Sequence, residues 1–216
     1  MNQQGDLKMD KAVVSIQMAL FFKDLIRNPE KVLQMVANNF NDMKFMPFFV
    51  QNQIYPVPSS IAANPNTNMI SATPERFDFI QTFASKTDLK NNFTNDARNI
   101  LEYICDIHTI SRIGLVSILF EETKEPIKRM KKLYFNNKIT EDLAELSIRK
   151  NKQTIFCDIK VNNIYSDEIV NDIAIFGEKK SGIITRHDIN TFFIEGGIDK
   201  EILNKFYKEN ISKLFG

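Results

Sequence analysis

The residues best suited to metal chemistry in this chain are its two histidines, His108 and His187. A mononuclear metal site needs three or four ligands, to which Asp106 with His108, or His187 with Asp188, could contribute. However, residues two apart on a helix do not face one another, and adjacent residues on a strand point to opposite faces. The spacing therefore favours a simpler interpretation, in which His108 is a cation at a helix C-terminus and His187 a half-exposed strand residue.

Arg186, His187 and Asp188 also have the residue types of acid–base catalysis. Such groups act as acids and bases only when a cleft fixes their geometry and shifts their pKa values. A hydrolase would require the fold to unite these three residues with Asp106 and His108. We therefore treat 186–188 as a candidate polar site, with a solvated charged segment as the alternative. No residue is predicted to be catalytic, and the residues favour a protein that is not an enzyme.

Both cysteines, Cys105 and Cys157, lie in apolar segments, which is typical of small buried hydrophobic residues. Neither has an evident environment that would activate it as a nucleophile. They could form a disulfide only if the fold brings them together, and two lone cysteines are not the framework of a secreted protein.

The most basic segment is a predicted helix that begins at Glu125-Pro126. Its candidate phosphate-contacting residues are Lys128, Arg129, Lys131 and Lys132. Acidic residues precede this helix, as its dipole favours, and no RNA-binding aromatic motif, zinc finger or recognition helix accompanies it. Nucleic acid is therefore not the expected partner. The patterns GxxxxGK[ST] and GxGxxG are also absent, and we predict neither a cofactor nor a bound metal.

Aromatic and aliphatic residues gather around positions 45–61. Phe48 and Phe49 are adjacent, so on a strand they would point to opposite faces, and one would lie on the face that helices leave uncovered. The following loop adds Ile54, Tyr55 and Val57. We interpret these five residues as a partner-binding or dimerising surface.

The composition is close to that of an average globular protein. Of 216 residues, 43% are hydrophobic and 25% charged, with a formal net charge of +1. The 18 Phe and 5 Tyr are too much aromatic surface for a disordered chain, and the balanced charge gives no overall attraction to nucleic acid or an anionic membrane. Residues 1–10 are polar without an apolar signal-peptide core, and the longest apolar run falls far short of the ~20 residues of a spanning helix. We expect a cytoplasmic protein without membrane contact.

Alternation and helical spacing predict the elements of secondary structure. Strands are expected over 11–22, 44–53, 69–83, 111–120, 143–148, 154–164 and 182–193. Helices are expected over 29–41, from a cap at 94–96 to about 108, after Glu125-Pro126, and after a cap at Asp199. The segment 56–67, which is rich in proline and asparagine, is expected to be a loop.

The two halves share one order: a long strand, a proline-opened helix, antiparallel strands and an amphipathic helix. Residues 19–32 parallel 118–128 at an offset of about a hundred residues. We predict an α+β fold of two pseudo-repeated β-α-β-β-α-like units, with a polar tail over 1–10, a first unit over 11–110 and a second over 111–216, or one continuous domain. A mostly antiparallel sheet needs helices on one face only, so its other face must be solvated or bind something.

Four stretches resemble a sporadically distributed, uncharacterised prokaryotic family of small α+β proteins. They are the early strand and helix, 70–79, the strand start at 111–115, and 186–192 with the helix that follows. The resemblance covers most of the chain, and the matched residues are structural in kind. The last strand of that family tends to carry paired acidic residues, whereas Asn190 stands at the second position here. The resemblance implies the fold and no catalytic residue.

The chain has many apolar residues but no group of residues typical of a catalytic or phosphate-binding site. This favours a protein-interaction module, which binds a protein partner or forms a homodimer. The AT-rich bias of the residues and the sporadic family suggest a phage or mobile-element protein in conflict between phage and host. The alternative is a small-molecule or nucleotide-ligand binding protein, with a pocket between a curved sheet and the C-terminal helix.

Overall fold

The computed structural model describes residues 11–40, 46–48, 60–63, 68–83, 90–141, 143–175 and 177–215. Along these residues the strands are β1 (Ala12–Phe22), β2 (Met46–Phe48), β3 (Ser60–Ala63), β4 (Asn68–Ala72), β5 (Arg76–Thr82), β6 (Ile110–Glu122), β7 (Ser147–Phe156), β8 (Ile159–Ile175) and β9 (Glu178–Thr191). The helices are α1 (Pro29–Asn39), α2 (Lys90–Ile107), α3 (Pro126–Phe135) and α4 (Lys200–Asn210), followed by the short 3-10 helix η2 (Ile211–Phe215).

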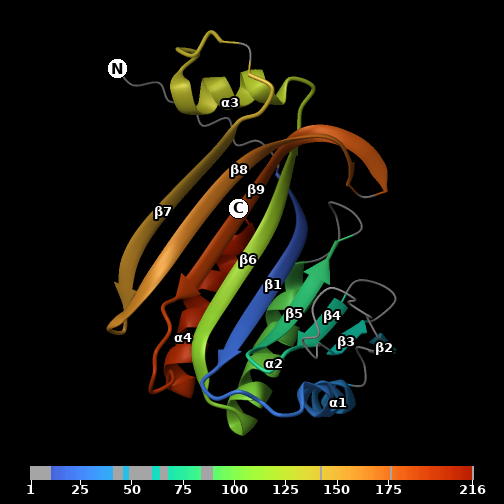
Figure 1. The fold of residues 1–216 in the computed structure, drawn as a ribbon, viewed down its shortest axis with the longest axis vertical. Coiled ribbons are helices and arrows are strands. Elements are labelled where there is room, and N and C mark those ends of the chain that lie inside the picture. The colour runs from blue at the N-terminus through green and yellow to red at the C-terminus, as the bar shows by residue number, and fades with distance from the viewer. Residues whose placement is uncertain are drawn as a thin grey trace.

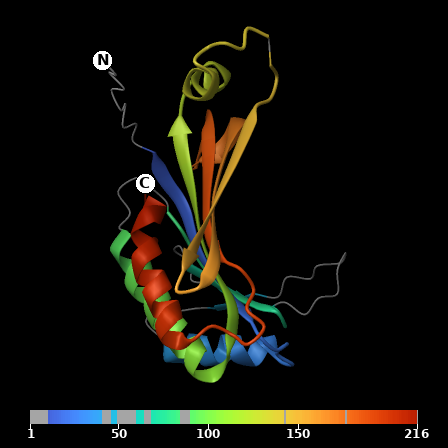
Figure 2. The same ribbon diagram turned by 90° about the vertical axis from the view of Figure 1, so that its left-hand side faces the viewer.

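The strands form one antiparallel sheet in the order β2-β3-β4-β5-β1-β6-β9-β8-β7 (Figure 1). β1 and β6 pair at its centre, so the sheet is continuous across the predicted boundary at 110–111. α2 and α4 lie side by side on the same side of this sheet (Figure 2). The prediction of an α+β fold with a mostly antiparallel sheet and helices on one face is confirmed.

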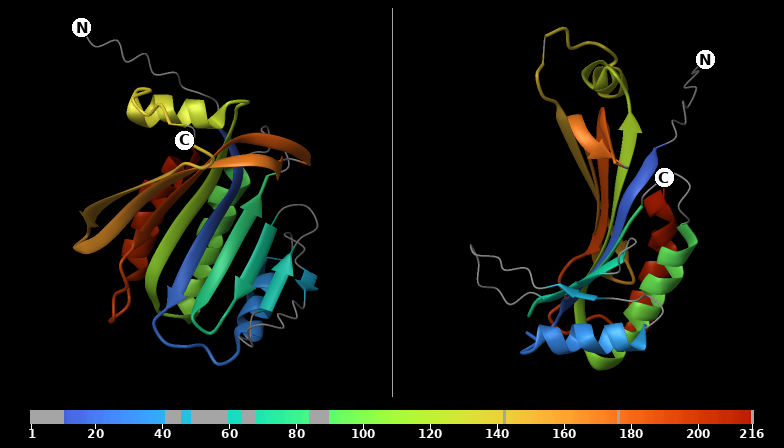
Figure 3. Two further views of the ribbon diagram at one scale, coloured as in Figure 1. Left: turned by 45° about the horizontal axis from the view of Figure 1, so that its top comes forward. Right: turned by 90° about the vertical axis from the view of Figure 1, so that its right-hand side faces the viewer.

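The two halves of the chain have a similar order of elements on either side of the β1–β6 pair. From β1 the order is strand, helix, four strands and helix; from β6 it is strand, helix, three strands and helix. α1 packs on β3 and β4, whereas α3 contacts β8 and β9 at the opposite end of the molecule (Figure 3). The two pseudo-repeated units therefore stay a prediction.

The core lies between the sheet and its helices. Ile16, Met18 and Leu20, at every second position of β1, are completely buried on the helix-facing side. On the neighbouring strand the ring of Phe79 stacks on that of Phe93 of α2, with centroids 5.2 Å apart. Period-two burial in β1 therefore divides the sheet into an apolar face and a second face with a different composition.

Two predictions for residues 56–83 were wrong. The expected strand 69–83 is two strands, because the N–H of Thr73 donates to the carbonyl of Arg76 at 2.8 Å and Pro74 favours a turn between them. The expected loop 56–67 contains β3, which pairs with β2 and β4. Pairing with neighbouring strands, rather than local composition, makes β3 a strand.

Two further boundaries differ from the prediction. α2 begins at Lys90, so the expected cap at 94–96 lies inside the helix, where Phe93 is buried. The expected strand 154–164 is interrupted by Cys157 and Asp158, whose φ angles of 46° and 63° form a two-residue turn between β7 and β8. Cys157 is consequently exposed rather than buried, Cys105 is partly buried, and both thiols are free.

None of the helices in the described part of the chain combines the length and apolar character needed to cross a membrane.

Gly182 of β9 is expected to tolerate no side chain. A Cβ at this position would lie 2.2 Å from the carbonyl oxygen of Glu121 and 2.8 Å from the ring of Phe120. Gly182→Ala should therefore lower the free energy of unfolding by about 1–3 kcal/mol, measured by urea denaturation. Gly196→Ala is the matched control, because nothing lies within 4 Å of a Cβ there. Equal stability of the two variants would contradict the close packing of β9 on β6.

Candidate functional site

The predicted partner-binding surface lies almost wholly outside the described residues. Phe49, Ile54, Tyr55 and Val57 belong to segments that the structure does not describe. The backbone of Phe48 ends β2, the strand at one edge of the described sheet. The interpretation of these five residues as a surface for a partner stays a prediction.

The candidate polar site at 186–188 is divided between the two faces of the sheet. His187 pairs opposite Ser117 on the side that faces the helices and is only 1% exposed. Arg186 and Asp188 point to the other side, as adjacent strand residues must. The half-exposed position expected for His187 was wrong, because the C-terminal segment packs over this part of the sheet.

His187 is held from several sides. Its Nε2 lies 2.8 Å from Oδ1 of Asn163, its ring stacks on that of Tyr165 with centroids 3.9 Å apart, and it forms a hydrogen bond with the backbone of Lys213. Burial lowers the pKa of His187, an effect that exceeds the opposing influence of Asp188. The neutral imidazole thus joins β8, β9 and η2.

The five residues of the hydrolase hypothesis are not brought together. His108 packs edge-on against Phe22, with ring centroids 5.0 Å apart, at the end of β6 where Ile110 begins. His187 lies opposite Ser117, seven residues farther along β6, or roughly 23 Å at the rise of a strand. Burial also lowers the pKa of His108, which disfavours the cation expected at this position. Asp106 binds Lys200. Within the described residues no group of three His, Cys, Asp or Glu could hold a metal ion.

The basic residues of α3 are mostly engaged within the protein. Nε of Arg129 donates to Glu121 at 2.8 Å, and both side chains are largely buried. Lys128 pairs with Glu125 on the surface. Lys131 donates to the carbonyl of Glu141, while Lys132 is exposed. Arg129 therefore anchors α3 to β6, and a phosphate-contacting role for this cluster stays a prediction.

The pocket that the alternative function predicts, between the sheet and the C-terminal helix, is filled with side chains. Leu203, Phe206, Tyr207 and Leu214, from α4 and η2, are each at most 1% exposed where they pack against the sheet. A groove of about 460 Å³ lies elsewhere, between the connection from β1 to α1 and the end of α2, and its lining includes His108. A ligand between α4 and the sheet would have to displace core residues.

The face opposite α2 and α4, which we call the open face, carries a series of polar residues and Phe21. By the strand registers it presents Ser71 on β4, Arg76 and Asp78 on β5, Gln17 and Phe21 on β1, Arg112 on β6, Arg186, Asp188 and Asn190 on β9, Asn162 on β8, and Asn151 and Gln153 on β7.

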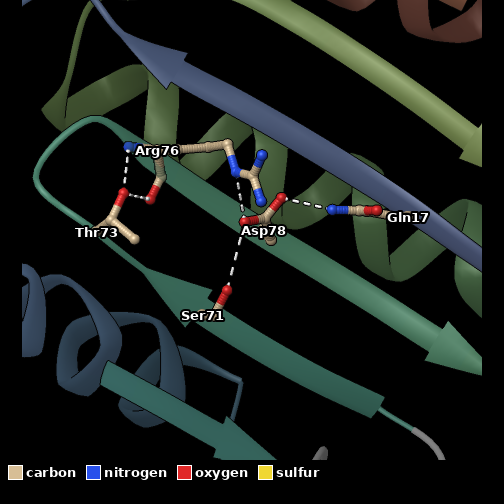
Figure 4. A network of polar contacts seen from close by, with 5 residues as sticks. All are labelled: Gln17, Ser71, Thr73, Arg76 and Asp78. Carbon is tan, nitrogen blue, oxygen red and sulfur yellow. Dashed lines mark hydrogen bonds and ion pairs between the residues drawn. The ribbon is translucent and has the colours of Figure 1, made fainter. Parts of the chain in front are cut away.

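Asp78 is the centre of one polar network on the open face (Figure 4). This carboxylate is 2% exposed and accepts hydrogen bonds from Nε2 of Gln17 at 2.7 Å and from Nε of Arg76 at 2.8 Å. The hydroxyl of Ser71 lies 3.4 Å from its second oxygen. Donors from three strands thus stabilise the buried charge and fix the direction of Arg76.

A ladder of amides crosses the other half of the open face. Asn151 and Gln153 of β7 both donate to Oδ1 of Asn162 at 3.1 Å. Asn162 donates to Asn190 at 3.2 Å, and Asn190 donates to Asp188 at 2.8 Å. Because each amide both donates and accepts, the ladder connects β9 through β8 to the outermost strand.

That outermost strand, β7, is the most exposed element of the sheet. It pairs with β8 on one side and ends the order of the described sheet, and eight of its ten residues are exposed. Ile155 near its end is 74% exposed. β7 carries Arg149, Lys150 and Lys152 and no acidic residue. The open face and β7 together form the candidate functional site.

The site residues that the sequence analysis missed had a readable signal. Gln17 lies between Ile16 and Met18, and Asp78 lies between Phe77 and Phe79. A polar residue flanked by buried apolar ones on a strand lies on the opposite face. The alternation was visible, but the pairing that brings Gln17 next to Asp78 depends on the β1–β5 register.

Comparison of the chain with protein-family models gives no match, and comparison with curated proteins gives none either. The family resemblance therefore stays a prediction.

Asp78→Asn should lower the free energy of unfolding by about 1–2 kcal/mol, because the amide has one acceptor oxygen for the two donors of Gln17 and Arg76 and loses the negative charge. Arg76 is 42% exposed and can be partly rehydrated, which limits the loss. Urea denaturation would measure the change. The control is Glu102→Gln, which breaks the exposed pair of Arg98 and Glu102 and should cost less than about 0.5 kcal/mol. An equal effect of both substitutions would refute the structural role of the Asp78 network.

The stability of the protein should decrease as the pH falls below about 6.5, the ordinary pKa of histidine. His187 binds a proton less readily in the folded than in the unfolded chain, so the unfolded state is favoured on acidification, by at most ~1.4 kcal/mol per pH unit for one such group. We expect His187→Gln to reduce this slope, leaving the contribution of His108. Unfolding free energies at several values between pH 5.5 and 7.5 would test this. An unchanged slope would show that His187 is not buried as described.

Proposed function

We propose that the protein is an interaction module that binds an extended, acidic segment of a partner protein along the outer edge of β7. The observation that carries this proposal is the position of β7 as a long, exposed strand at the edge of the described sheet. An extended peptide can add to such an edge through main-chain hydrogen bonds, with side chains adding specificity.

The edge is ordered in a way that suits this role. Asn151 and Gln153 are bound to Asn162, so two positions of β7 are fixed from the open face. On the helix-facing side Nζ of Lys150 lies 4.4 Å from the ring centroid of Tyr134. A strand that is already extended loses less conformational entropy when it binds a partner.

The charges of β7 favour an acidic partner. Arg149 and Lys152 are exposed on opposite faces of the strand, so an added strand would meet positive charge on both. Lysines also protect strand edges against non-specific pairing. The cations of β7 repel a basic strand, whereas they attract a strand that carries acidic residues.

The same charges disfavour pairing with a second copy of the chain. A two-fold antiparallel pairing that keeps both sheet faces continuous is centred on one residue, which lies opposite its own copy. Centred on Arg149, Lys150 or Lys152, the pairing places a cation opposite itself. Centred on Asn151, it places Lys150 opposite Lys152 of the second copy. Like charges directly opposite are destabilising, so registers near the middle of β7 are unfavourable.

We propose that this activity is cytoplasmic, and the two free thiols are compatible with a reducing compartment. A role in conflict between phage and host stays a prediction from the composition and the family resemblance.

The test uses two labelled ten-residue peptides in which pairs of valines alternate with pairs of either glutamates or lysines, so that both faces of the added strand carry charge. We expect the glutamate peptide to bind the wild-type protein saturably in fluorescence polarisation, to bind more weakly as salt is added, and to slow amide hydrogen exchange in β7. The lysine peptide should not bind. Arg149→Glu combined with Lys152→Glu should weaken binding of the glutamate peptide by about tenfold or more.

The control variant combines Lys124→Glu with Lys179→Glu, two exposed positions away from β7 that change the net charge equally. It should bind as the wild type does at physiological salt. Equal losses in the two double variants, or binding without protection of β7, would reject the proposal. So would a dimer in sedimentation analysis that the β7 substitutions dissociate, since the edge would then serve self-association.

A further inference from the structure

One row of side chains crosses the open face from β5 to β7 and alternates cations with apolar residues. In the order of the strands the row consists of Arg76, Phe21, Arg112, Phe192, Lys160 and Ile155. Phe192 follows Asn190 by two positions and so points to the same face, and its N–H donates to the carbonyl of Lys160 at 2.8 Å. At about 4.8 Å per strand, the row is roughly 24 Å long.

The apolar side chains at the β7 end of this row are open to solvent. Phe192 is 37% exposed and Ile155 is 74% exposed, and Phe193, the residue after Phe192, is 59% exposed. Across the part of the chain that the structure describes, these are three of six large apolar side chains that are exposed. An exposed aromatic ring on a sheet face is available to stack on a planar group.

The cations of the row are held in place by their neighbours or are exposed. The guanidiniums of Arg76 and Arg112 lie 5.5 Å and 4.9 Å from the ring centroid of Phe21, on either side of it in the strand order. Lys160 is exposed between Phe192 and the outermost strand. The row therefore presents positive charge along its length, with an aromatic ring between one cation and the next.

This positive charge is only partly compensated within the protein. Asp78 binds Arg76, but Arg112 and Lys160 form no ion pair with any residue that the structure describes. Asp188, an acidic residue on the same face, already accepts a hydrogen bond from Asn190. The row itself contains no acidic residue, so its charge is complementary to an anionic ligand.

We propose that this row binds single-stranded nucleic acid, with a base stacked on the ring of Phe192 and a phosphate beside Lys160. Proteins that bind single strands combine cations that attract the backbone with aromatic rings on which bases stack. An apolar protein surface would leave the cations without partners, and a duplex would present phosphates but no free base to Phe192. A single strand satisfies both kinds of side chain.

Neither the net charge nor the basic segment of α3 indicated such a partner, because the row forms only when six strands pair in register. The neighbouring row of the same face contains the amides Asn162 and Gln153, a type of side chain that hydrogen-bonds with the edges of bases. The row lies on the open face, and its binding of a strand does not depend on a peptide at the outer edge of β7.

The experiment measures the fluorescence anisotropy of labelled twelve-nucleotide oligothymidine and oligouridine as the full chain is added. We expect at least one of them to bind saturably and more weakly as salt is added. A DNA duplex of the same length is the control ligand and should bind more weakly than the single strand. The ratio of the two single-strand affinities shows whether DNA or RNA is preferred.

Phe192→Leu should weaken binding roughly tenfold, because it keeps an apolar side chain but removes the ring. Lys160→Gln should also weaken binding and should reduce the slope of log affinity against log salt by about 0.7. The matched controls are Tyr165→Leu, which removes a ring that is 43% exposed on the helix-facing side, and Lys208→Gln, at an exposed lysine of α4. Both should bind as the wild type does.

Circular dichroism confirms that each variant is folded. The absence of saturable binding of either single strand would overturn the proposal. Equally tight binding of the duplex would overturn it too, since the protein would then recognise only a polyanion. An unchanged affinity of Phe192→Leu would show that no base stacks on this ring and would have the same consequence.

Discussion

The pairing of β1 with β6 holds the two halves of the sheet together. These two strands come from different halves of the chain and carry both groups of outer strands and, through them, both groups of helices. Their register also places the apolar residues of both strands on the same face of the sheet. Met18 lies opposite Leu115 on the helix-facing side, and Phe21 lies opposite Arg112 on the open face. A shift by one residue would expose the core and bury the polar face.

Buried charges connect strands and helices outside the apolar core. Asp78 connects β4, β5 and β1, and Arg129 with Glu121 anchors α3 beside β6. Such pairs add little net stability compared with apolar packing, but breaking one leaves an uncompensated charge and is strongly unfavourable. They therefore define where the flanking elements dock. Arg112 departs from this pattern, since its buried Nε has no partner.

Local signals predicted the starts of three helices correctly. Asn28 accepts a hydrogen bond from the backbone N–H of Lys31, Asp199 accepts one from Glu201, and prolines open α1 and α3. Such caps act within a few residues, so the sequence contains all that is needed to place them. The errors arose where a distant partner decides. β3 exists because β2 and β4 flank it, and α2 extends to Lys90, beyond Phe93, whose ring stacks on Phe79.

Composition and periodicity were sufficient to predict the fold class, the one-sided placement of the helices and the alternation that separates an apolar from a polar sheet face. They did not predict which side chains of the open face meet. Gln17 and Asp78 are 61 positions apart, and Phe21 and Arg112 are farther still. The physical reason is that periodicity reports the direction of a side chain relative to its own strand, whereas a site requires the register and order of several strands, which long-range pairing alone establishes.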